Sequence, residues 1–248
     1  MNLIQFIQDT WGVNDKDLID FLKRVAINTK PSPDDPHDHA HYDKEAPATV
    51  DWNPYVGLIE NQLTKPRCVA QGCEVIARVH TNRGRGVDYH KGTMMADFDA
   101  QALYDLCKQN DGAPTAAGTY PRIGMKILRQ DGITEVQPYP GEVYRAKEYW
   151  RCKNRKEALN DLLTIGPVTV CVKWYLSFSS GEGVLIPKPR DRYVGLHQMC
   201  LTRRNEQDNK DEVTRGVNSH GPNFGMDGHF VLPDSQWDSL VTEVWCAK

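Results

Sequence analysis

The pattern of apolar residues changes near residue 165, and this change constrains the fold more than any other feature of the sequence. Before that point, apolar residues recur at helical intervals, and helices are predicted over 68–80, 98–109, 120–131 and 154–166. After it, strands are predicted over 167–174, 197–204, 212–218 and 228–233. Helices that come first and strands that come later predict an α+β fold with segregated layers.

Capping signals support three of these helices. Cys68 stands at the start of the first, directly after the segment that contains Pro66. Thr119 is predicted to cap the third, and Gly132 to end it in the way that glycine ends many helices. Asn154, with Glu157 three residues later, forms a capping box of the looser asparagine type.

A polar segment separates the beginning of the chain from the rest. Residues 29–48, TKPSPDDPHDHAHYDKEAPA, contain four prolines and clustered acidic residues, which indicates a linker or an extended arm. Two short helices are predicted before it. The sequence therefore predicts a helical segment and acidic arm over 1–47, which is a candidate pro-region, and a compact domain over 48–248.

Charge and hydropathy exclude several classes of protein. The formal net charge of −3 argues against a dedicated nucleic-acid binder, which usually carries a basic surplus. No apolar stretch approaches the ~20 residues of a membrane-crossing helix, so no membrane partner is expected. The first residues lack the basic start and cleavage site of a secretory signal. Seven cysteines, an odd number, favour reduced thiols in the cytoplasm of the producing or host cell, with association with a virion left open.

No metal or other cofactor is predicted. His37, His39 and His41 alternate along the polar arm and would share one face of an extended strand, but no further ligand lies near them in the sequence. Cys68 and Cys73 are separated more widely than the tight Cys-x-x-Cys hairpin of structural zinc sites. The arm is therefore interpreted as a solvated linker.

Four residues together form a candidate catalytic set. A helix start and a nearby imidazolium both lower the pKa of a thiol, which favours Cys68 as a nucleophile and His197 as its partner and proton donor. Asn218 would hold the imidazole ring at the required angle. Gln62 would donate, with the backbone N–H of Cys68, to the developing oxyanion, an interaction worth ~3 kcal/mol.

The segments around these residues resemble the papain-like cysteine peptidases. The matching segments are ATVDWNPYVGLIENQ (48–62), GLHQMCL (195–201) and VNSHGPNFGMDGHFVLP (217–233). His197 and Asn218 also follow Cys68 at or near the separations of ~130–150 residues that are typical of the family. Two further segments, LYDLCKQNDG and GTYPRIGMKILRQDGI, resemble the microbial and viral branch of the family more than its secreted plant and animal enzymes.

The resemblance implies a two-lobed fold and an activity. A helical lobe would carry Cys68, and an antiparallel sheet or small barrel would carry His197 and Asn218. A protein or peptide substrate would bind in the groove between the lobes. The implied function is that of a cysteine endopeptidase with a thioester intermediate. The sequence sets neither the oligomeric state nor the cleavage specificity.

The chain also departs from the family near the nucleophile. Pro66 and Arg67 stand where Gly-Ser or Gly-Ala is usual, and Lys65 occupies the position of a disulfide cysteine of secreted members. His220 replaces the tryptophan that commonly shields the His–Asn hydrogen bond from water. The acidic arm is further expected to lie over the cleft, on account of its position and charge.

Three alternatives follow from these departures. The first is a catalytically weak or inactive papain-like module that serves binding or structure. The second is a cell-wall or acyl-transfer hydrolase that uses the same residues. The third is a Cys-His-His site in which His220, rather than Asn218, orients His197.

Overall fold

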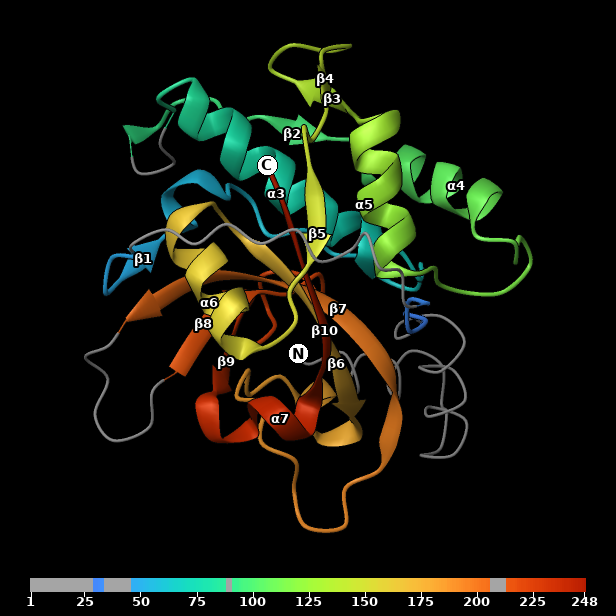
Figure 1. Ribbon diagram of the computed structural model, residues 1–248, viewed down its shortest axis with the longest axis vertical. Coiled ribbons are helices and arrows are strands. Elements are labelled where there is room, and N and C mark those ends of the chain that lie inside the picture. The colour runs from blue at the N-terminus through green and yellow to red at the C-terminus, as the bar shows by residue number, and fades with distance from the viewer. Residues whose placement is uncertain (1–28, 34–45, 88–90, 206–212) are drawn as a thin grey trace.

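The structure is a computed structural model that describes residues 29–33, 46–87, 91–205 and 213–248 (Figure 1). The two helices predicted before residue 29 and the three histidines of the polar arm lie outside the described residues. No helix in the described ranges combines the length and the apolar character that crossing a bilayer requires.

One lobe is built mainly from helices and occupies the upper half of Figure 1. Its helices are α3 (Cys68–Gly84), α4 (Ala100–Asn110) and α5 (Pro121–Gln130). A small antiparallel sheet completes it, with strands β2 (Asp97–Phe98), β3 (Ile133–Gln137) and β4 (Val143–Tyr144).

The other lobe is organised around a larger antiparallel sheet with the strand order β5-β10-β6-β7-β8-β9, and β1 pairs with β7. Its strands are β1 (Val50–Asp51), β5 (Tyr149–Arg151), β6 (Val168–Tyr175), β7 (Tyr193–Asn205), β8 (Val213–Val217), β9 (His229–Pro233) and β10 (Val241–Ala247). Helices α6 (Arg155–Thr164) and α7 (Trp237–Leu240) accompany this sheet. The predicted α+β fold with two lobes is therefore confirmed.

The predicted elements agree with the structure within a few residues, with one capping error. The helix α5 has Tyr120 at its N-cap and Pro121 at its first position, so the prediction of Thr119 as the cap is wrong. Proline suits the first helical position because its missing N–H would have no partner there. Gly132 ends the helix at φ +83°, and Asn154 accepts a hydrogen bond from the backbone N of Glu157 at 3.0 Å, as predicted.

The start of helix α3 is pressed against strand β7. Most of α3 is buried, and Gly72 makes the close approach possible. A Cβ atom at Gly72 would lie 2.8 Å from Nε2 of Gln198 and 3.0 Å from a methyl group of Thr169. The absence of a side chain at this position therefore lets the first turn of α3 lie beside the strand that carries His197.

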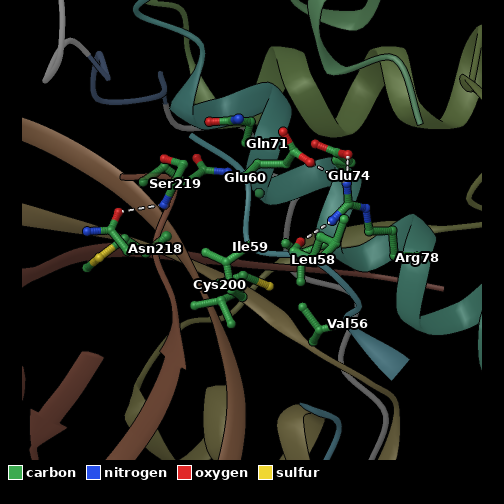
Figure 2. A pocket seen from close by; sticks show the side chains of 15 residues that line it. Val56, Leu58, Ile59, Glu60, Gln71, Glu74, Arg78, Cys200, Asn218 and Ser219 are labelled. Carbon is green, nitrogen blue, oxygen red and sulfur yellow. Dashed lines mark hydrogen bonds and ion pairs between the residues drawn. The ribbon is translucent and has the colours of Figure 1, made fainter. Parts of the chain in front are cut away.

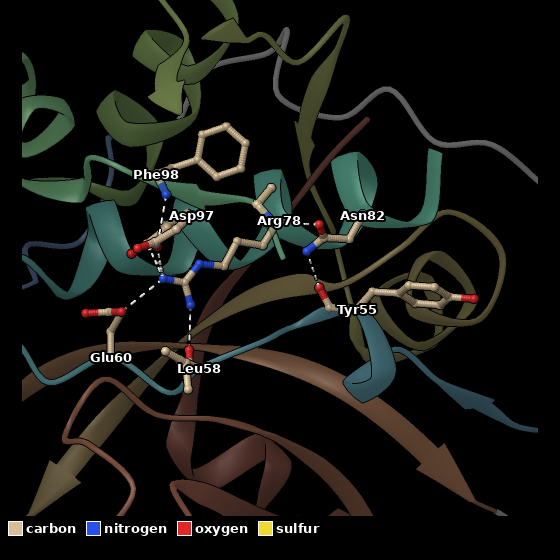
Figure 3. A network of polar contacts seen from close by, with 9 residues as sticks. Tyr55, Leu58, Glu60, Arg78, Asn82, Asp97 and Phe98 are labelled. Carbon is tan, nitrogen blue, oxygen red and sulfur yellow. Dashed lines mark hydrogen bonds and ion pairs between the residues drawn. The ribbon is translucent and has the colours of Figure 1, made fainter. Parts of the chain in front are cut away.

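A buried ion-pair network fixes the same helix to the chain that precedes the candidate oxyanion residue (Figure 3). The guanidinium of Arg78 pairs with Glu74 at 2.6 Å, with Glu60 at 3.0 Å and with Asp97. It also donates to the backbone carbonyl of Leu58. Burial raises the pKa of Glu74 to about 8, and the positive charge of Arg78 opposes that rise. Arg78 thus supplies the positive charge in a cluster of three acidic side chains, of which Glu74, with its raised pKa, is largely protonated at pH 7.

We expect Arg78→Met to lower the free energy of unfolding at pH 7 by about 3 kcal/mol, because it leaves partly or fully buried carboxylates without their cation. Denaturant unfolding would measure the change. Adding Asp97→Asn should recover part of the loss, since it removes a carboxylate that the guanidinium binds. Arg129→Met is the control, because Arg129 is exposed, and it should change stability by less than about 0.5 kcal/mol. An Arg78 variant as stable as this control would contradict a stabilising role for the network.

Candidate active site

Cys68 is the first residue of α3, and its thiol is buried, with 1% of the residue exposed. The first turn of the helix contains no acidic residue, so the positive end of the helix dipole is not offset there. Backbone groups of Val69 and Gln198 hydrogen-bond the sulfur. Since Gln198 directly follows His197, the nucleophile predicted from the sequence lies at the segment of β7 that carries the predicted base.

A short stretch before the compact domain covers this thiol. The hydroxyl of Thr29 lies 3.1 Å from the sulfur of Cys68 and shares a hydrogen bond with it. The backbone N of Thr29 donates to the carbonyl of Leu196 at 3.0 Å, and that of Lys30 to the carbonyl of Thr119 at 3.1 Å. We call residues 29–33 the strap, because they contact both lobes across the site.

The far end of the strap is also held by both lobes. The backbone N of Ser32 donates to a carboxylate oxygen of Glu243 on β10 at 2.9 Å. The hydroxyl of Ser32 accepts from the backbone N of Arg122 on α5 at 3.1 Å. Thr29 and Ser32 are both buried. The strap therefore lies between the helical lobe and the sheet lobe, in contact with the thiol.

His197 and Asn218 are joined directly. Nε2 of His197 donates to Oδ1 of Asn218 at 2.7 Å, and both residues are buried. Asn218 follows strand β8, and its backbone N donates to the carbonyl of Gly228 at 2.9 Å, which fixes the start of the loop. The other ring nitrogen of His197, Nδ1, makes no hydrogen bond to any described residue. Asn218, rather than His220, thus holds the ring of His197.

Aromatic rings enclose the His197–Asn218 pair. The indole of Trp174 lies edge-on to His197, with ring centroids 4.7 Å apart. The imidazole of His220 stacks on His197, also at 4.7 Å, with an angle of 25° between the planes. Phe224 lies against His220 at 5.6 Å. His220 therefore does cover the imidazole at the position where the resemblance expects a tryptophan.

Gln62 is held next to this pair by Ser219. The hydroxyl of Ser219 donates to Oε1 of Gln62 at 2.5 Å, and the backbone N of Gln62 donates to the carbonyl of Ser219 at 2.8 Å. The backbone N of Ser219 donates in turn to Oδ1 of Asn218 at 2.8 Å. Ser219 thus connects Gln62, the predicted oxyanion donor, with the amide of Asn218, which is predicted to orient His197. Gln62 is fully buried.

With the strap in place, the surroundings favour neutral forms of the thiol and the imidazole. Burial raises the pKa of the Cys68 thiol, and the hydrogen bond from Thr29 only partly offsets this. Burial also lowers the pKa of His197 to about 4, against the opposing effect of its bond to Asn218. A thiolate–imidazolium pair therefore needs water or substrate in place of the strap.

A small cavity lies next to Asn218 and Ser219 (Figure 2). Its lining comes from the chain around Ile59, from α3, from the middle of β7 and from the end of β8 with the two residues that follow it. The space inside it is about 20 Å³, which has room for a water molecule but not for a peptide side chain. It is therefore not a substrate site.

One cluster in the described ranges has the geometry of metal ligands, and it is already compensated. The carboxylates of Glu60, Glu74 and Asp97 lie within 4.8 Å of one another. The guanidinium of Arg78 binds all three, so the positive charge that a metal would bring is supplied by the chain. The seven cysteines are free thiols and all are buried.

Sequence reasoning missed three residues that the structure places at the site. Thr29 and Ser219 carry hydroxyl side chains, which are common on protein surfaces. No sequence motif around Thr29 indicates that it contacts the nucleophile. Glu243 lies in strand β10, which was not predicted. The proximity of the strap to Cys68 has only one sequence signal, namely the position and charge of the arm, from which we expected it to lie over the cleft.

Comparisons with known proteins agree with this geometry at the level of the fold. Models of known protein families give no match, and neither do curated proteins. Solved structures do match. Xylellain, a cysteine protease from Xylella fastidiosa, superposes with a TM-score of 0.75 at 17% identity, over 91% of this chain and 96% of that one.

The chain has the papain-like fold. Two proforms match similarly well. Procathepsin B S9 from Trypanosoma congolense gives a TM-score of 0.73 at 14% identity, over 93% of this chain and 88% of that one. Procathepsin L 3 from the larval midgut of Tenebrio molitor gives 0.73 at 16% identity, over 100% and 81%. The papain-like fold predicted from the sequence is confirmed, while identities this low leave the chemistry to the residues themselves.

Proposed function

We propose that the protein is a cysteine endopeptidase that hydrolyses protein or peptide substrates through Cys68, His197, Asn218 and Gln62. The observation that carries the proposal is the 2.7 Å bond between His197 and Asn218 beside a thiol at a helix start. A ring held through Nε2 leaves Nδ1 to exchange a proton with the sulfur, which is the arrangement that nucleophilic catalysis by a thiol requires.

Each residue has a step in this mechanism. The thiolate of Cys68 attacks the carbonyl carbon, and the negative charge that develops on the oxygen is stabilised by the amide of Gln62 and the backbone N–H of Cys68. The imidazolium of His197 gives its proton to the leaving amine, and a thioester remains on the sulfur. Water, deprotonated by His197, then hydrolyses the thioester and regenerates the thiol.

We further propose that residues 1–47 are a pro-region that inhibits this site and that residues 48–248 are the peptidase domain. The strap supports the first part, since Thr29 bonds the sulfur that would attack the substrate. Membership of the microbial and viral branch rests on the segments around α4 and α5. An intracellular location is supported by the odd number of cysteines, none of which is paired.

The alternative is a papain-like module without turnover, and the neutral, thoroughly buried thiol is the observation in its favour. The two proposals predict different pKa values for the Cys68 thiol when the strap is absent. A peptidase should then have a thiolate paired with an imidazolium over a wide pH range, whereas an inactive module should have a thiol with a pKa near the ordinary ~8.5.

Alkylation of the chain without residues 1–47 distinguishes them. We expect iodoacetamide to label Cys68 at pH 6 at nearly the rate found at pH 8, and the label to be absent from a Cys68→Ala variant. Peptide mapping reports which cysteine reacts, with the six other buried cysteines as internal controls. A rate that falls about tenfold per pH unit below pH 8 would instead identify an ordinary thiol and favour the inactive module.

A further inference from the structure

His220 is a buried imidazole that the proposed chemistry does not use. It is 9% exposed, and its ring stacks on that of His197 with centroids 4.7 Å apart. The edges and faces of Trp174 and Phe224 surround the remainder of the ring, at 5.4 Å and 5.6 Å. His220 therefore packs among aromatic side chains, as an apolar aromatic ring at this position would also do.

The contacts of Asn218 determine what His220 does. Oδ1 of Asn218 accepts two hydrogen bonds, from Nε2 of His197 at 2.7 Å and from the backbone N of Ser219 at 2.8 Å. The other end of the amide, Nδ2, is therefore the donor, and it lies 3.3 Å from Nδ1 of His220. For this contact to be a hydrogen bond, Nδ1 of His220 must be unprotonated, which puts the ring proton on Nε2.

The other ring nitrogen of His220, Nε2, lowers the stability of the folded protein. Nε2 is buried and makes no hydrogen bond within the described residues. A buried polar atom without a partner is destabilising, and a phenylalanine ring of similar shape would avoid that loss. An imidazole at this position therefore requires a compensating contact, and the acceptor that Nδ1 offers to Asn218 is the one present.

We propose that His220 is a positioning residue, whose neutral ring holds the amide of Asn218 with Oδ1 turned toward His197. The proposal rests on the proposed peptidase function, because orientation of His197 matters only where His197 transfers protons. If the amide flipped, its NH₂ group would face the N–H groups of Ser219 and His197, and two hydrogen bonds would be lost. The bond from Nδ2 to His220 adds a third contact that only this orientation satisfies, and it holds the end of the amide that the two bonds at Oδ1 leave unpaired.

Burial lowers the pKa of His220, and the neighbouring charge of His197 lowers it further during the reaction. Among the described residues, the titratable group whose charge acts on His220 is His197, on the neighbouring strand β7. Trp174 on β6 and Phe224 in the following loop add no charge. When His197 becomes an imidazolium, a second proton on the ring stacked against it is disfavoured. The acceptor is therefore retained at the step that needs it.

The tautomer of His220 tests the proposal directly in the full-length chain. Nitrogen NMR of protein labelled with ¹⁵N-histidine distinguishes a protonated ring nitrogen from an unprotonated one, and the His220→Phe spectrum assigns the signals. We expect a neutral ring with its proton on Nε2 at pH 7. A proton on Nδ1, alone or together with one on Nε2, would overturn the proposal, because Nδ1 then cannot accept.

Two variants separate the acceptor from the ring. His220→Phe keeps a flat ring without an acceptor, whereas His220→Asn places an oxygen near the position of Nδ1 without the ring. In full-length protein, we expect His220→Phe to slow alkylation of Cys68 at pH 6 about tenfold, and His220→Asn to remain within about threefold of the parent chain. For peptide hydrolysis, the loss in His220→Phe should fall on kcat, with KM within about twofold.

Three patterns would contradict an acceptor role: unchanged rates in both variants, an equal loss in both, or a larger loss in His220→Asn. The strap affects every full-length variant in the same way, so ratios to the parent chain remain valid. If the chain without residues 1–47 has no reactive thiolate, the peptidase proposal fails, but the tautomer of His220 in the full-length chain still shows whether the ring positions Asn218.

Discussion

His197→Ala is expected to lower kcat/KM for peptide hydrolysis by about 10⁴-fold or more, measured in the chain without residues 1–47. The variant removes both the partner that stabilises the thiolate of Cys68 and the acid that protonates the leaving amine. Cys68→Ala should cause a loss of at least the same size. Because the two groups act as a unit, the double variant should be no worse than the more impaired single variant.

The matched control for these variants is Cys73→Ala. Cys73 lies five residues further along α3, is fully buried and is also a free thiol. It faces the interior near Cys107 and Cys200 rather than the strap. We expect it to reduce stability modestly and to leave kcat within about threefold of the parent chain. A comparable loss in Cys73→Ala would mean that the effects reflect folding instead of chemistry.

Asn218→Ala should cost less than loss of His197, because it removes the group that orients the base and leaves the base in place. The expected loss in kcat is about 10- to 100-fold, measured with the same substrate. In this variant the backbone N of Ser219 loses its acceptor at residue 218, whereas the hydroxyl of Ser219 keeps its separate bond to Gln62. A loss in Asn218→Ala as large as that in His197→Ala would show that the ring no longer enters the site.

The sequence predicted most of the elements that have a regular period and missed several that do not, although β3, whose burial alternates along the strand, was missed as well. Strand β10 was not predicted because it lies between β5 and β6 and is buried on both faces over most of its length, so apolar and polar residues do not alternate along it. Strands β2 and β4 contain two residues each, which is too short for any periodicity. The pattern of residues along the chain cannot predict such strands, because they form by pairing with strands that are distant in the sequence.

The candidate site follows the same distinction. Cys68, His197 and Asn218 were predicted from their residue types and from their order and separation along the chain, and Gln62 from the preceding segment that resembles the papain-like peptidases. The stacking of His220 on His197 could not be predicted in this way, because it depends on how the loop after β8 returns toward β7. The contact between Thr29 and Cys68 depends on the path of a segment that contains no periodic signal at all.

Deleting residues 1–47 is expected to raise kcat/KM for peptide hydrolysis by about 100-fold or more. The reason is geometric, since the strap bonds the nucleophile at Thr29 and contacts both lobes through Lys30 and Ser32. If the site is covered 99% of the time, only 1% of the molecules can bind substrate, and removing the cover restores the rest. Unchanged activity after the deletion would dispose of the inhibitory role.

A peptide added in trans makes this test specific for the strap. We expect a synthetic peptide spanning residues 25–37 to inhibit the chain without residues 1–47 competitively. If the tethered strap covers the site 99% of the time, the free peptide should reach half-inhibition at a concentration about 100-fold below the effective concentration that the tether provides within one molecule. The same peptide with Thr29→Val keeps the shape of that side chain and loses the hydroxyl that bonds Cys68, so it should bind more weakly. Equal inhibition by a scrambled peptide would show that the groove takes any extended chain, and the particular contacts of Thr29 and Ser32 would then contribute little to closing the site.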